Sequence, residues 1–161
     1  MHSCTALPGG FHMNTNLNNY ETDHDAWVVN QAALLRAGQL NTLDIEHIAD
    51  ELEEIMGNNR RELHRRFRVL IGHLLKWQFQ PDKRTPSWRS TIRNQRNDIE
   101  DMIEESPSLK RLIPEKIALA YPKAVALASD ETGFPKKTFP VTCPYTDAEI
   151  LDDEFWPEQP K

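Results

Sequence analysis

Hydrophobic residues recur at spacings of three and four along most of the chain, which is the period of an amphipathic α-helix. No stretch shows the strict alternation of a half-buried β-strand. The spacing predicts helices over residues 23–38, 41–56, 60–80, 87–103, 107–113 and 114–133. An all-α fold follows from this pattern.

Helix-breaking residues separate these segments. Gly57–Asn59 interrupts the pattern between the second and third helices, and Pro81 ends the third. Ser87 is placed to cap the fourth helix. Gly133 closes the last long helix. We therefore expect the second and third helices to be separate elements that can pack against each other.

One apolar stripe defines the expected core. In segment 60–80 it comprises Leu63, Phe67, Leu70, Ile71, Leu74, Trp77 and Gln78. The helices over 41–56 and 87–103 are expected to complete that core. A chain of 161 residues has the usual size of one domain. We therefore predict an all-α, single-domain bundle of about five to six helices over residues 20–158, with a Pro-rich C-terminal extension.

The two ends of the chain differ in composition from the helical part. Residues 1–19 are rich in asparagine and glycine, so we expect a disordered leader. Prolines recur too often between 134 and 145 for regular structure, before Thr146 and Glu149 form a capping box for a last helical turn. No apolar run approaches the ~20 residues that cross a bilayer. With no feature of a secretory signal at the start, we expect no membrane partner and a cytoplasmic location.

Charge is distributed unevenly along the sequence. Residues 1–59 carry net charge −8, residues 60–96 carry +9, and residues 97–161 carry −7, within a total of −6. The simplest cause is an internal clamp, in which the acidic helix over 41–56 lies against the arginines of the next two helices. The carboxylates expected to make it are Asp44, Glu46, Glu51 and Glu53.

The basic segment 60–96 is also the best candidate for a binding surface. At ~100° per residue, Arg61, Arg65, Arg68, Lys76 and Phe79 fall on one outward line of their helix. On the following helix Arg89, Arg93 and Arg96 align beside the apolar stripe, and Lys83 and Arg84 lie at the tip of the loop between them. The candidate binding residues are Arg61, Arg65, Lys76, Lys83, Arg84, Arg89 and Arg93. Cations beside tryptophans are typical of nucleic-acid surfaces, and a protein partner is the alternative.

Several longer motifs resemble those of a known bacterial family. They are "YETDHDAW", "LLRAGQ", "LDIEHIADELEEIMG", "HLLKWQFQPDKRTPSW", "SPSL", "FPVTCPYT" and "ILDDEFWPE", and together they cover roughly residues 20–158. In this order they resemble the domain of unknown function 29. The resemblance implies a small helical protein and brings no assigned activity with it.

Arg68 and His73 are the candidate catalytic residues, because an Arg and a His with four residues between them resemble the active motif of HEPN-type ribonucleases. There the histidine acts as acid and base, and the arginine stabilises negative charge that develops on RNA. Two features depart from that motif. Val69 follows the arginine where a polar residue is usual, and five helical steps place the two side chains ~140° apart.

A metal site would have to gather ligands around His73 from several helices. The available ligands are His24, Asp25, His47, Asp50 and Glu54. Three of them line the outer face of their helix, and no HExxH spacing occurs, so we expect no metal. No glycine-rich phosphate loop or GxSxG motif occurs either, so no cofactor is expected. The sequence therefore favours a non-catalytic protein- or nucleic-acid-interaction module over an enzyme, with a metal-independent ribonuclease as the alternative.

Overall fold

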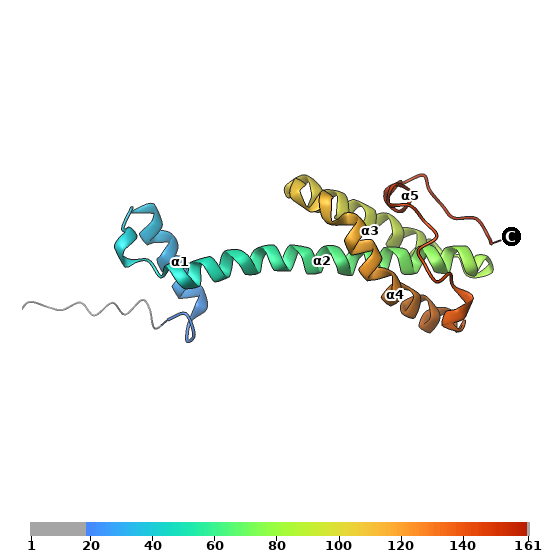
Figure 1. Cartoon of the computed structure of the whole chain (residues 1–161), viewed down its shortest axis with the longest axis horizontal. Coiled ribbons are helices and arrows are strands. Elements are labelled where there is room, and N and C mark those ends of the chain that lie inside the picture. Colours follow the sequence, from blue (N-terminus) through green and yellow to red (C-terminus); the bar gives the residue numbers. More distant parts are fainter. Residues whose placement is uncertain (1–18, 161) are drawn as a thin grey trace, which may run out of the picture. The chain divides into compact units, whose positions relative to one another are not determined.

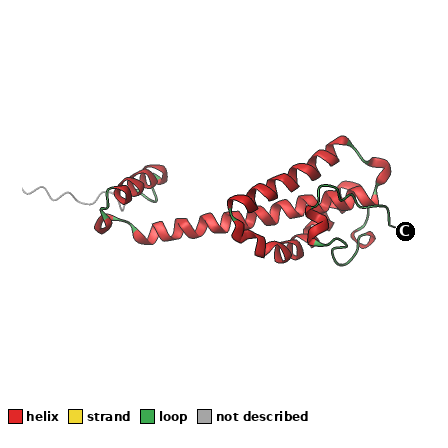
Figure 2. Ribbon diagram, turned by 90° about the horizontal axis from the view of Figure 1, so that it is seen from above, coloured by secondary structure: helices red, strands yellow, loops and turns green. Residues whose placement is uncertain are grey.

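The computed structural model describes residues 19–160, in which every regular element is helical (Figures 1 and 2). The elements are α1 (His24–Arg36), the 3₁₀ helix η1 (Leu40–Thr42), α2 (Ile45–Phe79), η2 (Pro81–Lys83), α3 (Pro86–Glu105), η3 (Pro107–Leu112), α4 (Ile113–Thr132), η4 (Lys136–Thr138) and α5 (Asp147–Leu151). The all-α prediction is confirmed. The predicted leader, apart from residue 19, lies outside the described residues. None of these helices combines the length and apolar composition needed to cross a membrane.

Helix α2 is one continuous helix of 35 residues. The predicted interruption at Gly57–Asn59 is therefore wrong, and so is the clamp that required segment 41–56 to fold back over segment 60–80. Four large apolar residues of segment 41–56, which was expected to complete the core, are also exposed, namely Ile45, Leu52, Ile55 and Met56. The chain divides into two compact units, one ending at Ile55 and the other starting at Met56.

The first unit is organised around a small buried polar cluster. The side chain of Asp23 caps α1 by accepting a hydrogen bond from the Ala26 amide at 3.1 Å. One turn into the helix, Trp27 is buried and its indole Nε1 donates to Asp44 Oδ2 at 3.2 Å. His47 Nδ1 lies 2.7 Å from the same carboxylate oxygen. Two of the histidines considered as metal ligands are thus engaged with carboxylates, because His24 Nε2 also lies 2.9 Å from Glu51 Oε1.

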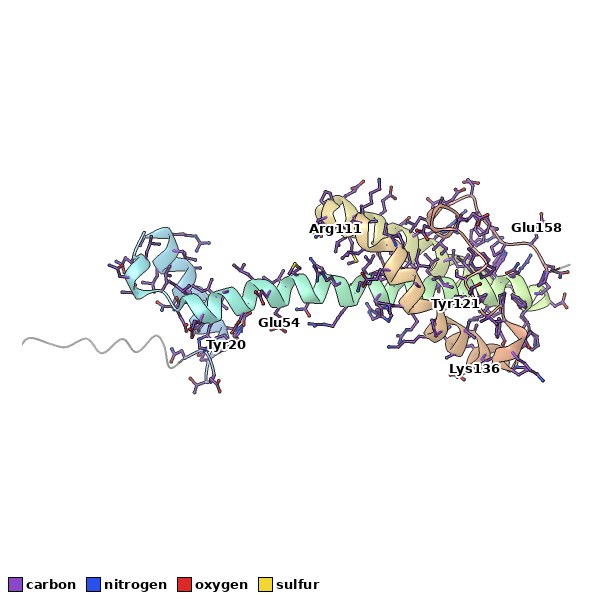
Figure 3. All side chains as sticks on the ribbon, in the orientation of Figure 1. Tyr20, Glu54, Arg111, Tyr121, Lys136 and Glu158 are labelled. Atoms are coloured by element: carbon purple, nitrogen blue, oxygen red, sulfur yellow. The ribbon has the colours of Figure 1, made fainter. Side chains whose placement is uncertain are left out.

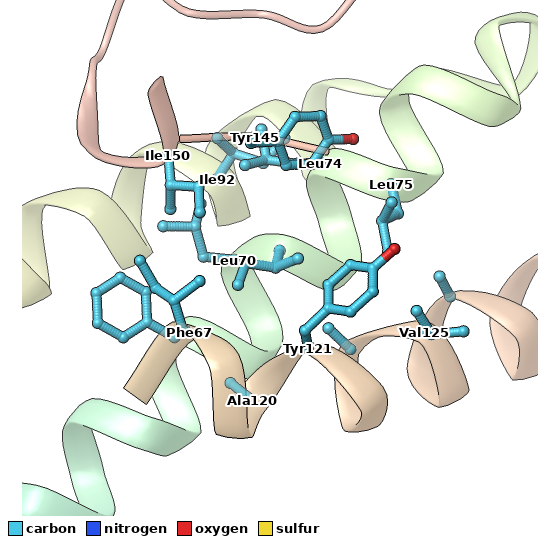
Figure 4. Close-up of a cluster of buried hydrophobic side chains, with 14 of the residues drawn as sticks. Phe67, Leu70, Leu74, Leu75, Ile92, Ala120, Tyr121, Val125, Tyr145 and Ile150 are labelled. Carbon is cyan, nitrogen blue, oxygen red and sulfur yellow. The ribbon is translucent and has the colours of Figure 1, made fainter. Parts of the chain in front are cut away.

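The second unit contains a continuous hydrophobic core. Figures 1 and 2 show α3 and α4 beside the C-terminal half of α2, and Figure 4 shows the side chains that meet between them. From α2 the fully buried residues are Leu63, Phe67, Leu70, Ile71, Leu74 and Leu75. Every predicted apolar member of the 60–80 stripe is therefore buried, because its spacing of three and four keeps it on one side of the helix.

Close packing of α2 against α4 depends on Gly72. A Cβ added there would meet a terminal methyl carbon of Leu127 at 2.7 Å. The smallest residue thus allows the two helices to approach closely. Facing it, α4 presents the small residues Ala120, Ala124 and Ala128, all fully buried.

The connections after α2 explain where the later helices begin and end. Pro81 follows the end of α2, as predicted, but the cap of α3 is Thr85, whose hydroxyl accepts from the Trp88 amide at 3.2 Å. Ser87 is inside the helix, so that prediction is wrong. Gly133 ends α4 with a left-handed φ of 76°. Of residues 107–113, expected as a short helix, Pro107–Leu112 form η3 and Ile113 begins α4.

The C-terminal segment is part of the second unit's core. Phe139, Tyr145 and Ile150 are buried, and Phe155 and Trp156 pack partly against the same core. The predicted capping box of Thr146 and Glu149 is present. A separate Pro-rich extension is not confirmed, because these apolar side chains anchor the segment to the helices.

A candidate anion-binding groove

An open groove lies between the end of α2 and the first half of α3, within the second unit. Its volume is about 490 Å³ and its lining includes three arginines but no carboxylate among the described residues. The lining residues are Trp77, Arg84, Thr85, Pro86, Arg89, Ser90, Arg93, Asn94 and Asn97. The groove therefore concentrates positive charge together with neutral hydrogen-bonding side chains.

Local sequence explains how these side chains come to share one groove. On α3, positions 86, 90, 94 and 97 are three or four residues apart, and so are 89, 93 and 97, so they lie along one side of the helix. The Thr85 cap and Pro86 in the first turn fix where that helix starts. Arg84 then immediately precedes the cap, at the mouth of the groove.

Tryptophan rings hold the arginines in position. The Arg84 guanidinium stacks over Trp77 at 4.7 Å, and its Nε donates to the Trp77 carbonyl at 2.8 Å. The Arg89 guanidinium lies 5.6 Å from the Trp77 ring and 5.8 Å from the Trp156 ring. Arg93 lies 6.0 Å from Trp156. Such contacts orient a guanidinium without removing its charge.

The arginines of the groove keep their charge available. No ion pair within residues 19–160 involves Arg84, Arg89 or Arg93. All three arginines are exposed. The groove can therefore attract an anion from solution, and the planar guanidinium forks suit phosphate or carboxylate oxygens.

Two residues that were predicted on the outward line of segment 60–80 point into the protein instead. Lys76 is only 3% exposed, forms an ion pair with Glu131 of α4, and lies 4.3 Å above the Trp88 ring. Phe79 packs edge-on against Phe139, with ring centroids 5.1 Å apart. The prediction of outward side chains at Lys76 and Phe79 is wrong, because α4 and the C-terminal segment cover that part of α2.

The other predicted binding residues lie outside the groove. Arg61 is exposed and donates to Asn58 Oδ1, while Arg65 forms two short hydrogen bonds with Glu62 on the same helix. Lys83 is exposed in η2. The structure thus brings Arg84, Arg89 and Arg93 together in the groove, and it places Arg61, Arg65 and Lys83 outside it.

Sequence reasoning missed part of the groove and the role of one arginine. The neutral lining residues Ser90, Asn94 and Asn97 could have been found from their helical spacing relative to Arg93. Trp156 could not, because it comes from the far end of the sequence. Arg96 was predicted only to border the apolar stripe, but it is 2% exposed and donates to the backbone carbonyls of residues 150, 153 and 155.

Arg68 and His73 occupy different surroundings on α2. The Nδ1 of His73 lies 2.9 Å from the Val69 carbonyl, and burial lowers the pKa of His73. Arg68 lines a separate cavity of about 420 Å³ with Lys123 and Asp130, and His73 is not part of that lining among the described residues. A neutral imidazole with Nδ1 protonated would leave Nε2 as its hydrogen-bond acceptor.

Comparison with protein-family models gives a match over residues 19–156 to the family described as "Domain of unknown function DUF29". Comparison with curated proteins and with solved structures gives no match.

Proposed function

The chain belongs to the family of the domain of unknown function DUF29, and from that premise we propose that it is a non-catalytic binding module whose arginine groove holds the phosphate backbone of single-stranded nucleic acid. One observation carries the proposal. Three guanidinium groups without carboxylate partners converge on an open groove that offers no acidic side chain among the described residues.

The geometry of the groove suits a chain of phosphates better than one isolated anion. Arg89 and Arg93 are one helical turn apart, about 6 Å along the axis of α3. That spacing is close to the separation of successive phosphates in an extended strand. Ser90, Asn94 and Asn97 add neutral hydrogen-bonding groups beside the cations, as phosphate and sugar contacts commonly require.

The binding should depend on salt in a predictable way. If three arginines each neutralise one phosphate of a single strand, log K should fall with log salt at a slope of about −2. Replacing Arg89 by Ala should weaken binding and reduce the magnitude of that slope by about 0.7, because one counterion fewer is released. Fluorescence polarisation of a labelled single-stranded RNA, titrated at several salt concentrations, measures both quantities.

A matched control is Arg111→Ala, because Arg111 is an exposed arginine in η3 and is absent from the groove lining (Figure 3). Its slope should equal that of the wild type. The proposal is wrong if Arg111→Ala and Arg89→Ala weaken binding equally, or if binding does not respond to salt. Preferential binding of an acidic peptide in the same assay would replace the nucleic acid by a protein partner.

A metal-independent ribonuclease using Arg68 and His73 is the second candidate. The observation in its favour is the hydrogen bond from His73 Nδ1 to the Val69 carbonyl, which would leave Nε2 free to take a proton from a 2′-hydroxyl. The test is to incubate RNA with wild-type protein and with His73→Ala in the presence of a chelator. Intact RNA in both reactions supports the binding module, whereas cleavage lost in His73→Ala supports the enzyme.

A further inference from the structure

The N-terminal half of α2 carries an apolar face with no cover in the described structure. Its members Ile45, Leu52 and Ile55 are each more than half exposed, and Met56 is nearly so. At ~100° per residue Ile45, Leu52 and Met56 fall on one side of α2, with Ile55 at its edge. We call it the 45–56 apolar face.

Acidic side chains specify what could cover this face. By helical periodicity Glu46 and Glu53 border it along one edge, and Asp50 and Glu54 lie further round the same helix. Residues 1–55 carry nine acids and one base. A partner with like charge would be repelled, so a matching surface must combine cations with an exposed apolar group.

The second unit offers such a surface at a place separate from the groove. It lines a cavity of about 560 Å³ and consists of Arg60, Arg61, His64, Lys116, Leu119 and Lys123. We call it the α2/α4 basic surface. Four of its six residues are lysines or arginines, no carboxylate is among them, and Leu119 is 54% exposed. The ion pair of Lys116 is with its own sequence neighbour, Glu115.

Positive charge on this surface is concentrated enough to affect its histidine. Burial, together with the nearby charges of Lys123, Lys116 and Arg68, lowers the pKa of His64. The buried Nδ1 of that ring has no hydrogen-bond partner among the described residues. An acidic counterpart would relieve the repulsion between these cations.

We propose that the 45–56 apolar face of one molecule docks onto the α2/α4 basic surface of a second copy. Leu52 and its apolar neighbours would cover Leu119, while Glu53 would approach the lysines around it. Because the two contacting patches differ, a single contact joins the copies head to tail, which gives a ring or an open filament. If two copies instead exchange the contact reciprocally, the result is an isologous dimer.

Sedimentation velocity of the full chain over a concentration series tests this assembly. The wild type should be larger than a monomer at micromolar concentrations and should dissociate partly in high salt. Leu52→Asp should weaken self-association by at least about tenfold, because it places a charge against an apolar partner. Leu52 is exposed, so the variant should fold, and circular dichroism checks this. Val141→Asp is the matched control, because Val141 is 97% exposed elsewhere on the chain.

A charge exchange separates specific docking from general stickiness. Glu53→Lys and Lys123→Glu should each weaken self-association, whereas an equal mixture of the two variants should associate. In a mixed pair the unaltered Glu53 of one variant faces the unaltered Lys123 of the other, and the two exchanged charges also face each other. Lys137→Glu is the control for the added negative charge and should self-associate like the wild type by itself, because Lys137 is exposed and belongs to neither patch. A monomeric wild type, equal behaviour of Leu52→Asp and Val141→Asp, or a mixture no larger than its separate components would each overturn the proposal.

Discussion

Arg96 should be the most important single polar side chain for the stability of the second unit. It is 2% exposed on α3, yet its three guanidinium nitrogens donate to backbone carbonyls more than fifty residues later in the sequence. The distances are 2.9 Å to the Ile150 oxygen, 2.9 Å to Phe155 and 3.4 Å to Asp153. The same guanidinium lies 5.5 Å from the Trp156 ring. One side chain thus fastens the whole C-terminal segment to the helices.

The magnitude follows from these contacts. A hydrogen bond to a charged group contributes about 1.5–3 kcal/mol, and only the two at 2.9 Å have good length. Part of this gain is offset by the desolvation of the guanidinium, which also lowers the pKa of Arg96. We therefore expect Arg96→Met, which keeps most of the apolar stem, to reduce the free energy of unfolding by about 3 kcal/mol.

Urea unfolding followed by circular dichroism measures this change, and hydrogen exchange locates it. Amides of α5 and residues 152–157 should lose protection in Arg96→Met. Arg93→Met is the control, because Arg93 is exposed and such substitutions usually change stability by less than about 0.5 kcal/mol. If Arg96→Met were within 1 kcal/mol of the wild type, or α5 kept its protection, buried hydrogen bonds to carbonyls would not be what holds this segment.

Two further predictions concern the other buried polar groups. Lys76→Met should change the free energy of unfolding, measured with urea, by less than about 1 kcal/mol. The reason is that its partner Glu131 is half exposed and regains water when the lysine is removed. A loss of several kcal/mol would contradict this. In the first unit, the hydrogen bond to Asp44 raises the pKa of His47, so the pair's stabilisation is complete below pH ~6.5 and is lost as the pH rises through the raised pKa. An NMR titration of the His47 ring should show that raised pKa, and Asp44→Asn should return it towards its ordinary value; an unchanged midpoint would refute the coupling.

The core could be predicted from sequence because burial on α2 follows local periodicity from Leu63 onward. Leu63, Phe67, Leu70 and Leu74 are three or four residues apart, Ile71 comes four residues after Phe67, and all five are fully buried. The cap at Thr146 and the end of α4 at Gly133 are likewise local, since each depends on a hydrogen bond or a backbone angle within one turn.

The continuity of α2 could not be predicted with the same reasoning. One glycine and two asparagines in a helix interior disfavour it by about 2 kcal/mol in total. That is a strong local signal, but a helix of 35 residues can absorb it. The packing of the apolar residues from Leu63 onward stabilises α2 by more free energy than Gly57, Asn58 and Asn59 cost through their low helix propensity. Intrinsic propensity is a weak guide wherever tertiary contacts begin one turn later.

Whether each arginine of α3 is buried or exposed depends on which segment covers it, and that segment comes from a distant part of the sequence. Arg89, Arg93 and Arg96 are spaced by four and three residues on one helix and look equivalent in the sequence. Only Arg96 is buried, because the backbone around Ile150 lies over it. Its charge is stabilised by carbonyl dipoles and an indole, and the nearby carboxylates of Asp152 and Asp153 also favour it. The same tryptophan leaves Arg89 and Arg93 oriented but unpaired within the described residues, and their charge remains available for a phosphate in the groove.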